Sequence, residues 1–248
     1  MKLDDVKKLH QKKYRAQFGY YLVEGEHLVL ELDKAYANKP SASETTLYVT
    51  SAHEQWAQNL SAAFNVVVLN DKQMSNISDT KSPQGIIACV PLNTASSPKT
   101  ERAATNHRYI YLHEVQDPGN LGTILRSLAW FGQYTLLLSP NSVDPFNPKV
   151  VRSSMGAIFH VPIEQDVSLD NLQQRFTQFA YLDLKGTNIA HSTFGNYECY
   201  LFGNEARGVP QAALRACNAS AFTIAGSGQI ESLNLASAVN ICVYQLSL

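Results

Sequence analysis

The chain has 248 residues and a net charge of −1, and 45% of its residues are hydrophobic against 17% charged. This composition excludes a disordered chain, and the length favours two small domains over one. Near-neutrality excludes a global attraction to nucleic acid, so any basic patch must be local. The charged N-terminus lacks the apolar core of a signal peptide. No apolar run reaches the roughly 20 residues that a membrane span needs. The four cysteines form no CxxC pair. We therefore expect a cytoplasmic protein with no membrane partner and with reduced cysteines.

Basic residues are concentrated at the N-terminus. Residues 1–15 contain Lys7, Lys8, Lys12, Lys13 and Arg15, and we predict one short basic helix there. Two interpretations stay open: a solvated helix face, or a patch that contacts phosphate groups.

The rest of the first half alternates between helix and strand patterns. Leu28, Leu32 and Ala35 recur at helical spacing after Gly25, which predicts an amphipathic helix within residues 18–37. Strands are predicted at 46–50, 65–69 and 82–92, and helices at 53–64 and 71–79. We therefore expect a small α/β domain over residues 1–92, followed by a polar, aperiodic linker over 93–107.

The second half alternates in the same way and is expected to form one domain over residues 108–248. Strands are predicted at 108–115, 135–139, 159–163, 180–184, 198–203 and 221–225, and helices at 120–131, 149–159, 169–179, 209–217 and 231–248. Short apolar strands separated by helices indicate a buried parallel sheet.

Four polar stretches follow predicted strands or end predicted helices. Asn120, expected to cap its helix, precedes Arg126; the others are 152–157, 203–208 and the glycine-containing loop 226–234. Taken alone, each stretch can be explained as an ordinary turn or helix cap. Parallel α/β proteins nevertheless bind ligands at the carboxyl ends of their strands. The loop 226–234 lacks the third glycine of GxGxxG and the lysine of a P-loop.

The order and spacing of these stretches resemble a known family. Asn-x-Gly-x-x-x-Arg (120–126), Arg-Ser-Ser-x-Gly-Ala (152–157), Gly-Asn-Glu-x-x-Gly (203–208) and Glu-Ser-Leu-Asn (231–234) are similar to the motifs of the SpoU/TrmH family. Its members are S-adenosylmethionine-dependent RNA ribose 2′-O-methyltransferases of the SPOUT superfamily. The first half resembles the RNA-binding extension of this family, a small α/β domain similar to certain ribosomal proteins. Arg15 and the segments VEGEHLVLE and SPQGIIA carry this resemblance.

The resemblance implies a trefoil knot in the second domain, a homodimer with the site at the subunit interface, and ribosomal or transfer RNA as the substrate. It implies catalytic roles for Asn120, Arg126, Glu205, Ser232 and Asn234. S-adenosylmethionine would be held, mainly by main-chain groups, near Leu201, Gly203, Ile224, Gly228 and Leu233. RNA would contact Lys7, Lys8, Lys12, Lys13, Arg15 and Arg152.

The chemical role of Arg126 stays open at this point. The ribose hydroxyl must lose its proton before it attacks the methyl group. Arg126 is either the base or, because an arginine keeps its proton, a clamp on an RNA phosphate. Glu205, Ser232 and Asn234 would orient the ribose, Arg126 and the loop.

Two other functions are compatible with an α/β chain of this kind: a non-catalytic RNA-binding protein on the same fold, and a nucleotide-dependent oxidoreductase. The missing GxGxxG argues against the oxidoreductase. The chain departs from the family pattern at Ala206, Ala225 and Leu235, where glycine, proline and valine are common, and these are small changes in loop packing. The seven histidines show no metal-ligand spacing, so no metal is expected.

Overall fold

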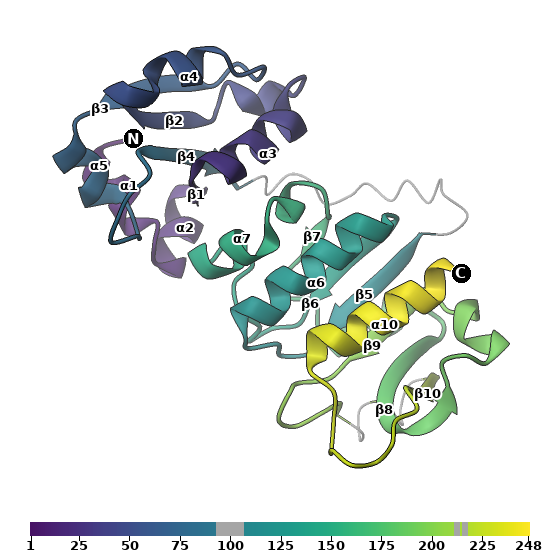
Figure 1. Ribbon diagram of the computed structural model, residues 1–248. Coiled ribbons are helices and arrows are strands. Elements are labelled where there is room, and N and C mark those ends of the chain that lie inside the picture. The colour runs from purple at the N-terminus through teal and green to yellow at the C-terminus, as the bar shows by residue number, and fades with distance from the viewer. Residues whose placement is uncertain (93–106, 211–213, 215–217) are drawn as a thin grey trace. The chain divides into compact units, whose positions relative to one another are not determined.

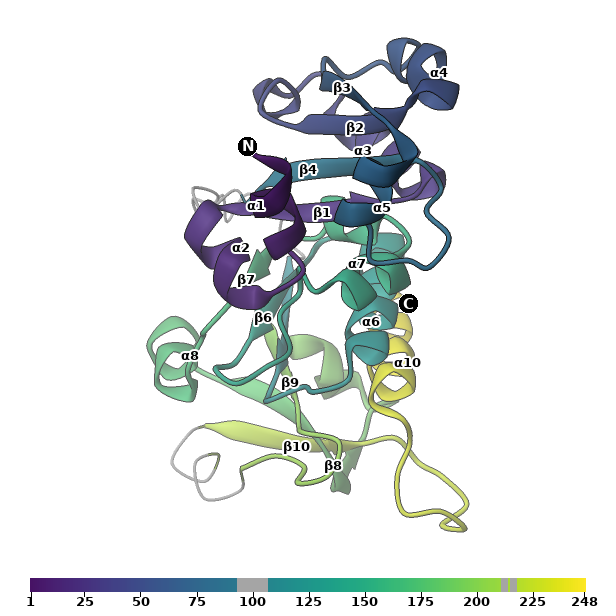
Figure 2. The same ribbon diagram turned by 90° about the vertical axis from the view of Figure 1, so that its left-hand side faces the viewer.

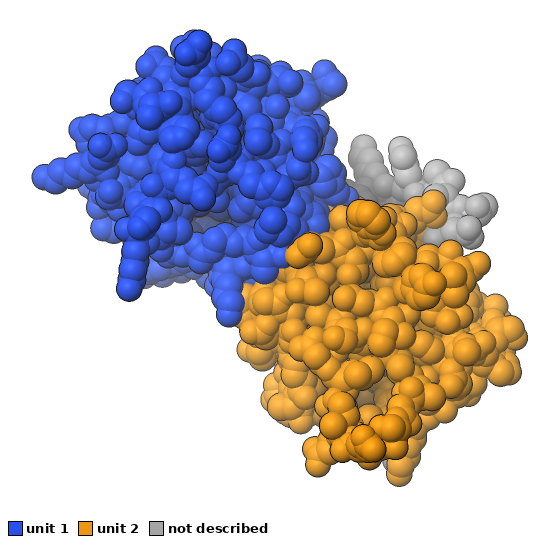
Figure 3. All heavy atoms as spheres, in the orientation of Figure 1, with its two compact units in different colours: residues 1–97, 144–160 blue, residues 98–143, 161–248 orange. Residues whose placement is uncertain are grey.

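The computed structural model describes residues 1–92, 107–210, 214 and 218–248. The chain divides into two compact units, Met1–Ser97 with Asp144–His160, and Pro98–Val143 with Val161–Leu248 (Figure 3). Most of the predicted linker 93–107 and of the predicted helix 209–217 lies outside the described residues. In the part of the chain that is described, no helix has the length and apolar character to cross a bilayer.

The first unit is built on a mixed four-stranded sheet. Its strands are β1 (Tyr20–Glu24), β2 (Thr46–Thr50), β3 (Asn65–Leu69) and β4 (Ile86–Pro91), in the order β1-β4-β2-β3 (Figure 1). Only β2 and β3 run parallel. Helices α1 (Leu3–Lys8), α2 (Lys12–Phe18), α3 (Glu26–Tyr36), α4 (Glu54–Gln58) and α5 (Asp71–Ile77) surround the sheet. One core cluster joins α1 and α5 to the strands through Val6, Leu9, Leu22, Tyr48, Leu69, Met74, Ile77, Ile87 and Cys89.

Three predictions for this unit need correction. Residues 1–15 enter two helices instead of one, because Gln11 is extended between α1 and α2. Strand β1 lies inside the segment 18–37, for which only a helix was predicted, and Gly25 with φ +105° separates β1 from α3. The helix predicted at 53–64 ends at Gln58.

The second unit confirms the predicted parallel sheet. Its strands are β5 (Arg108–Leu112), β6 (Tyr134–Leu138), β7 (Ile163–Glu164), β8 (Phe179–Asn188), β9 (Cys199–Phe202) and β10 (Ala219–Thr223). They run parallel in the order β10-β8-β9-β5-β6-β7. Helices α6 (Pro118–Phe131) and α10 (Leu235–Ser247) lie side by side on one face, and α8 (Leu169–Arg175) covers the other (Figure 2). The central strands are buried on both faces, which explains their continuous apolar runs.

A stretch from the second half of the sequence belongs to the first unit. Helix α7 (Pro148–Ser154) and the 3-10 turn Ala157–Phe159 replace the single helix predicted at 149–159. The helix ends because Met155 and Gly156 have φ of 50° and 92°. A Cβ on Gly156 would lie 2.6 Å from Glu31 Cβ, so glycine allows this turn to pack closely against α3.

Candidate active site

The helix that begins after β5 is capped by Asp117. Its Oδ1 accepts a hydrogen bond from the main-chain N–H of Asn120 at 2.7 Å, and Pro118 occupies the first helical position. The prediction that Asn120 caps this helix is therefore wrong. Since Asp117 caps the helix, the side chain of Asn120 is available for other contacts.

Three polar side chains from three separate segments meet in a hydrogen-bonded row. Asn234 Nδ2 donates to Asn120 Oδ1 at 2.9 Å, and Asn120 Nδ2 donates to Glu205 Oε1 at 3.3 Å. Asn234 precedes α10, Asn120 lies in the first turn of α6, and Glu205 follows β9. We call Asn234, Asn120 and Glu205 the polar row.

The direction of every hydrogen bond in the polar row follows from the helix cap at its start. Asn234 Oδ1 accepts the N–H of Ser237 as the cap of α10, so its NH₂ group must point toward Asn120. Asn120 must then offer its oxygen to Asn234 and its NH₂ group to the next residue. Only an acceptor can follow, and a carboxylate is the strongest acceptor available.

The turn that carries Glu205 is held in place by the residues around it. Asn204 is 7% exposed, accepts the N–H groups of Ala206 and Arg207, and donates to the carbonyl oxygen of Glu114 at 2.7 Å. Arg207 forms an ion pair with the Glu114 carboxylate. A Cβ on Gly203 would lie 2.2 Å from the carbonyl carbon of Gly208, so only glycine permits this tight turn.

Two of the predicted catalytic residues lie outside the polar row. Arg126 is exposed on α6, and no hydrogen bond or ion pair holds it within the described residues. It lies six residues after Asn120, which places it about 9 Å further along the helix axis on a different face. Ser232 is exposed, and nothing in the described part of the chain is hydrogen-bonded to its hydroxyl.

The loop between β10 and α10 presents unpaired main-chain groups next to the polar row. Over residues 225–233, which are all described, the one hydrogen bond to the main chain is from Gln229 N–H to Ser227 Oγ at 3.4 Å. Ile230 and Leu233 expose 71% and 44% of their surfaces. Free N–H and C=O groups beside uncovered apolar side chains suit a ligand with a flat ring and polar edges, such as adenosine.

Four of the five predicted cofactor residues lie in this loop or at the end of a strand, and the fifth is buried in the sheet. Gly228 has φ +76° in the loop, Leu233 ends it, Ile224 begins it, and Gly203 lies at the end of β9. Leu201 is fully buried in the middle of β9, paired with Tyr111 on one side and Tyr181 on the other. The placement of Leu201 in the core of the sheet argues against direct contact with a cofactor.

Exposed apolar side chains gather on α6 and α10, which lie side by side (Figures 1 and 2). The two helices are joined by a 2.5 Å hydrogen bond from Ser127 Oγ to Asn240 Oδ1. Trp130 is 85% exposed, and Tyr244 is 55% exposed while its ring contacts Phe131. Exposed side chains of Trp130, Ile241, Tyr244 and Leu248 form what we call the helix-pair face. Arg126 lies on the exposed side of the same helix α6.

The predicted RNA-contacting residues all lie in the first unit. Lys12 and Lys13 are exposed, with the Lys13 ammonium 4.6 Å from the centre of the Tyr14 ring. Lys7 donates to Asn76 at 2.9 Å, and Lys8 forms an exposed ion pair with Asp5 at 2.8 Å. These four lysines can all reach solvent.

Arg15 is placed differently from the lysines. It is 3% exposed, and its guanidinium donates to Asp144 Oδ2 at 2.9 and 2.5 Å and to the carbonyl oxygen of Leu9 at 2.7 Å. All three nitrogens are therefore used inside the first unit, which argues against an RNA contact. A buried ion pair is instead a structural element of that unit.

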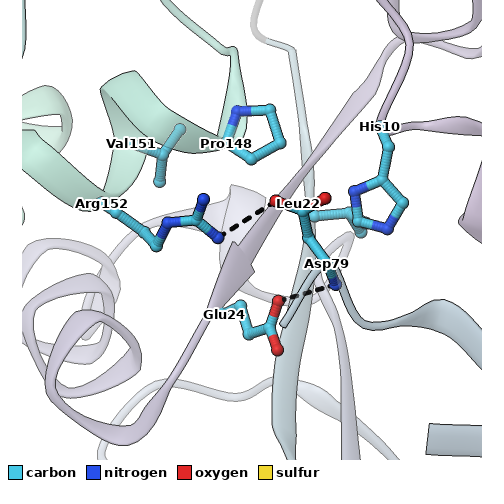
Figure 4. Close-up of a pocket in the computed structure, with 7 residues that line it drawn as sticks. All are labelled: His10, Leu22, Glu24, Asp79, Pro148, Val151 and Arg152. Atoms are coloured by element: carbon cyan, nitrogen blue, oxygen red, sulfur yellow. Dashed lines mark hydrogen bonds and ion pairs between the residues drawn. The ribbon is translucent and has the colours of Figure 1, made fainter. Parts of the chain in front are cut away.

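Arg152 lines a small pocket of the first unit. Its guanidinium forms an ion pair with Asp79 at 3.1 Å, and the Asp79 N–H donates to Glu24 at 3.1 Å (Figure 4). About 42% of the Arg152 side chain is exposed. The pocket is lined by His10, Leu22, Glu24, Asp79, Pro148, Val151 and Arg152. Arg152 is thus accessible from solvent.

Three residues that organise the site were not predicted. The capping role of Asp117 could have been predicted from the sequence, because an aspartate directly before a proline at a helix start is a common N-cap. Asn204 stands in the 203–208 motif but was given no role of its own, and Glu114 lies in no motif. The hydrogen bond between them joins segments 90 residues apart.

Comparisons with known proteins identify the families that the two halves of the chain match. A family model described as the SpoU rRNA methylase family matches residues 107–244, and one described as an MRM3-like substrate binding domain matches residues 2–88. A Bacillus subtilis protein named 23S rRNA (guanosine(2553)-2′-O)-methyltransferase RlmP is 30% identical over 99% of this chain and 95% of its own length.

Solved structures share the architecture. The AdoMet-bound rRNA methyltransferase from Sinorhizobium meliloti gives a TM-score of 0.78 at 28% identity, over 98% of this chain and 93% of that one. The SpoU methyltransferase AviRb from Streptomyces viridochromogenes, solved with AdoMet, gives a TM-score of 0.82 at 21% identity, over 99% and 96% of the two chains. At 21% identity, the similarity to AviRb shows a shared fold and nothing more.

Proposed function

The chain belongs to the SpoU rRNA methylase family, and from this premise we propose that it transfers the methyl group of S-adenosylmethionine to a ribose 2′-hydroxyl of ribosomal RNA. The observation that carries the proposal is the polar row, which joins Asn120, Glu205 and Asn234 beside a loop with unpaired main-chain groups. Ribosomal RNA in bacteria is cytoplasmic, and we place the reaction there.

The loop 224–234 and Gly203 hold the cofactor in this proposal. When bound, S-adenosylmethionine supplies an electrophilic methyl group on a sulfonium. Main-chain groups near Ile224, Gly228 and Leu233 bind the adenosine, and the exposed apolar side chain of Leu233 covers its ring. Ser232 and Asn234, at the end of this loop, orient the ribose of the target nucleotide.

Arg126 serves the site of a second subunit. Within one chain it lies away from the polar row, yet it shares α6 with the exposed apolar residues of the helix-pair face. Burial of that face against a second copy removes apolar surface from water and brings Arg126 of one subunit toward the polar row of the other. There its guanidinium binds an RNA phosphate through a fork of hydrogen bonds.

Mixing two defective variants tests this dimer. Arg126→Ala and Asn234→Asp are each expected to lose methyl transfer. If Arg126 acts across the interface, mixed dimers contain one intact site, and random mixing restores about a quarter of wild-type activity. If mixed chains stay inactive although they have exchanged subunits, Arg126 does not act in trans.

The trefoil knot is part of the same proposal. Strand β10 lies at one edge of the sheet, whereas α10, which follows it, packs against α6. Residues 224–234 must therefore return across the carboxyl edge of the sheet, past the turn 203–208. That path supports threading of the C-terminal segment through the preceding loops, against the general rule that chains avoid knots.

The first unit recognises RNA in this proposal, with residues 1–92 as the substrate-binding domain, 93–107 as the linker and 108–248 as the methyltransferase domain. Lys7, Lys8, Lys12 and Lys13 supply phosphate contacts, and Arg152 adds one if its pair with Asp79 opens. Replacing the exposed Lys12 and Lys13 by glutamine should reduce the slope of log affinity against log salt by about 0.7 to 0.9 per lost contact. An unchanged slope removes this surface from the proposal.

The enzymatic function is tested directly with radiolabelled S-adenosylmethionine. The purified protein should bind the cofactor in calorimetry and transfer label to ribosomal RNA that lacks 2′-O-methylation at the target position. Alkaline hydrolysis should then leave one resistant linkage, because a methylated 2′-oxygen cannot attack the adjacent phosphate. Cofactor binding without transfer to any ribosomal or transfer RNA would instead support a non-catalytic RNA-binding protein.

A further inference from the structure

Methyl transfer to a ribose hydroxyl needs a group that accepts the hydroxyl proton. A hydroxyl is a poor nucleophile until that proton is lost, and a positioned side chain must have a free lone pair to take it. Arg126 carries only donors and keeps its own proton in proteins. The base must therefore be sought among the other groups of the site.

The two asparagines of the polar row cannot supply the base. Asn234 uses its oxygen for the N–H of Ser237 and its NH₂ group for Asn120, and Asn120 uses its oxygen and NH₂ group for Asn234 and Glu205. Amides are also too weakly basic to hold a proton at neutral pH.

Glu205 is the carboxylate of the polar row, and one of its oxygens is free to accept a proton. Its Oε1 receives the hydrogen bond from Asn120, whereas no hydrogen bond or ion pair within the described residues engages its Oε2. The side chain is exposed, so Oε2 can be reached by a substrate. Asn204, Gly203 and the pair between Glu114 and Arg207 hold the turn that presents it.

We propose that Glu205 is the general base of the reaction, an inference that rests on the proposed methyltransferase function. The ribose 2′-oxygen forms a bond to the methyl carbon while the bond from that carbon to the sulfonium sulfur breaks and leaves its electron pair on sulfur. The hydroxyl proton passes to Oε2 of Glu205 and then to solvent. Asn120 holds Oε1 throughout, and this fixes the direction in which Oε2 points.

Glu205→Gln is the informative variant. Glutamine keeps an oxygen to accept from Asn120 but replaces the free oxygen by an NH₂ group that cannot accept a proton. Single-turnover methyl transfer should fall by about 10²- to 10⁴-fold, the usual contribution of general base catalysis. The dissociation constant for S-adenosylmethionine, measured by calorimetry, should stay within about twofold because the proposed adenosine contacts are made mainly by main-chain groups, which this substitution does not remove.

The pH dependence separates a base from a positioning role. The wild-type rate should decrease as the pH is lowered, because a protonated carboxyl cannot accept the hydroxyl proton. Glu205→Gln should lose this decrease and react slowly at every pH. The matched control is Glu198→Gln, which removes an exposed carboxylate just before the other end of β9 and should keep both rate and profile.

Two outcomes overturn the inference alone: a Glu205→Gln rate within threefold of wild type, or a slow variant that keeps the wild-type pH profile. The proposed function fails separately if the wild-type protein binds no S-adenosylmethionine or methylates no RNA.

Discussion

At the scale of single residues, Asn234 has two functions that a well-chosen substitution can separate. Its oxygen caps α10 through Ser237, and its NH₂ group begins the polar row through Asn120. An aspartate can still cap the helix but cannot donate to Asn120.

Asn234→Ala should lower the free energy of unfolding by about 1 kcal/mol, the usual cost of a lost N-cap, and should also abolish methyl transfer. Asn234→Asp should change stability by less than about 0.5 kcal/mol and still lose most activity. Urea unfolding and single-turnover assays on the same samples give both quantities. If Asn234→Asp were fully active, the polar row would have no part in the reaction.

At the scale of elements, the buried pair between Arg15 and Asp144 joins α2 to the residues before α7. The two charged groups are 3% and 9% exposed, and Asp144 Oδ2 accepts two hydrogen bonds from the guanidinium. The first unit therefore depends on residues that are far away in the sequence.

Arg15→Ala should lower the free energy of unfolding by about 3 to 5 kcal/mol, because it leaves the Asp144 charge buried without a partner. Lys8→Ala, which removes an exposed pair with Asp5, is the control and should leave the free energy of unfolding nearly unchanged. Urea unfolding of the full chain measures both. Equal, small losses would mean that Asp144 regains its solvation when Arg15 is removed.

At the scale of the whole molecule, burial sets how stability depends on pH. Burial lowers the pKa of His107 and of His113, and Nδ1 of His113 is buried with no hydrogen-bond partner among the described residues. In the unfolded chain both histidines return to a pKa of about 6.5. The unfolded state therefore binds more protons just below that pH, and stability falls as the pH drops.

Replacing both His107 and His113 by glutamine should reduce this pH dependence. The free energy of unfolding of the wild type should decrease more between pH 7.5 and 5.5 than that of the double variant. Urea unfolding at both pH values measures the difference, and the other titrating groups cancel in the comparison. Parallel profiles would show that neither histidine is protonated preferentially in the unfolded state.

The sequence predicted the second unit better than the first. Buried parallel strands such as 135–139 and amphipathic helices such as 120–131 leave clear apolar patterns, and both were confirmed with small shifts of their ends. Strand β1 was missed because its five residues lie next to a longer helical pattern. The two N-terminal helices were merged because the break at Gln11 leaves no glycine or proline signal.

The sequence by itself determined the class of protein, because the order and spacing of its polar motifs can be recognised without knowing the fold. Only the tertiary structure decided which of those side chains contact one another. It joined Asn120, Glu205 and Asn234, placed Arg126 apart from them, and buried Arg15 and Leu201. The physical reason is that hydrogen bonds and burial act over a few ångströms in space, whereas the residues that they join are up to 138 positions apart in the chain.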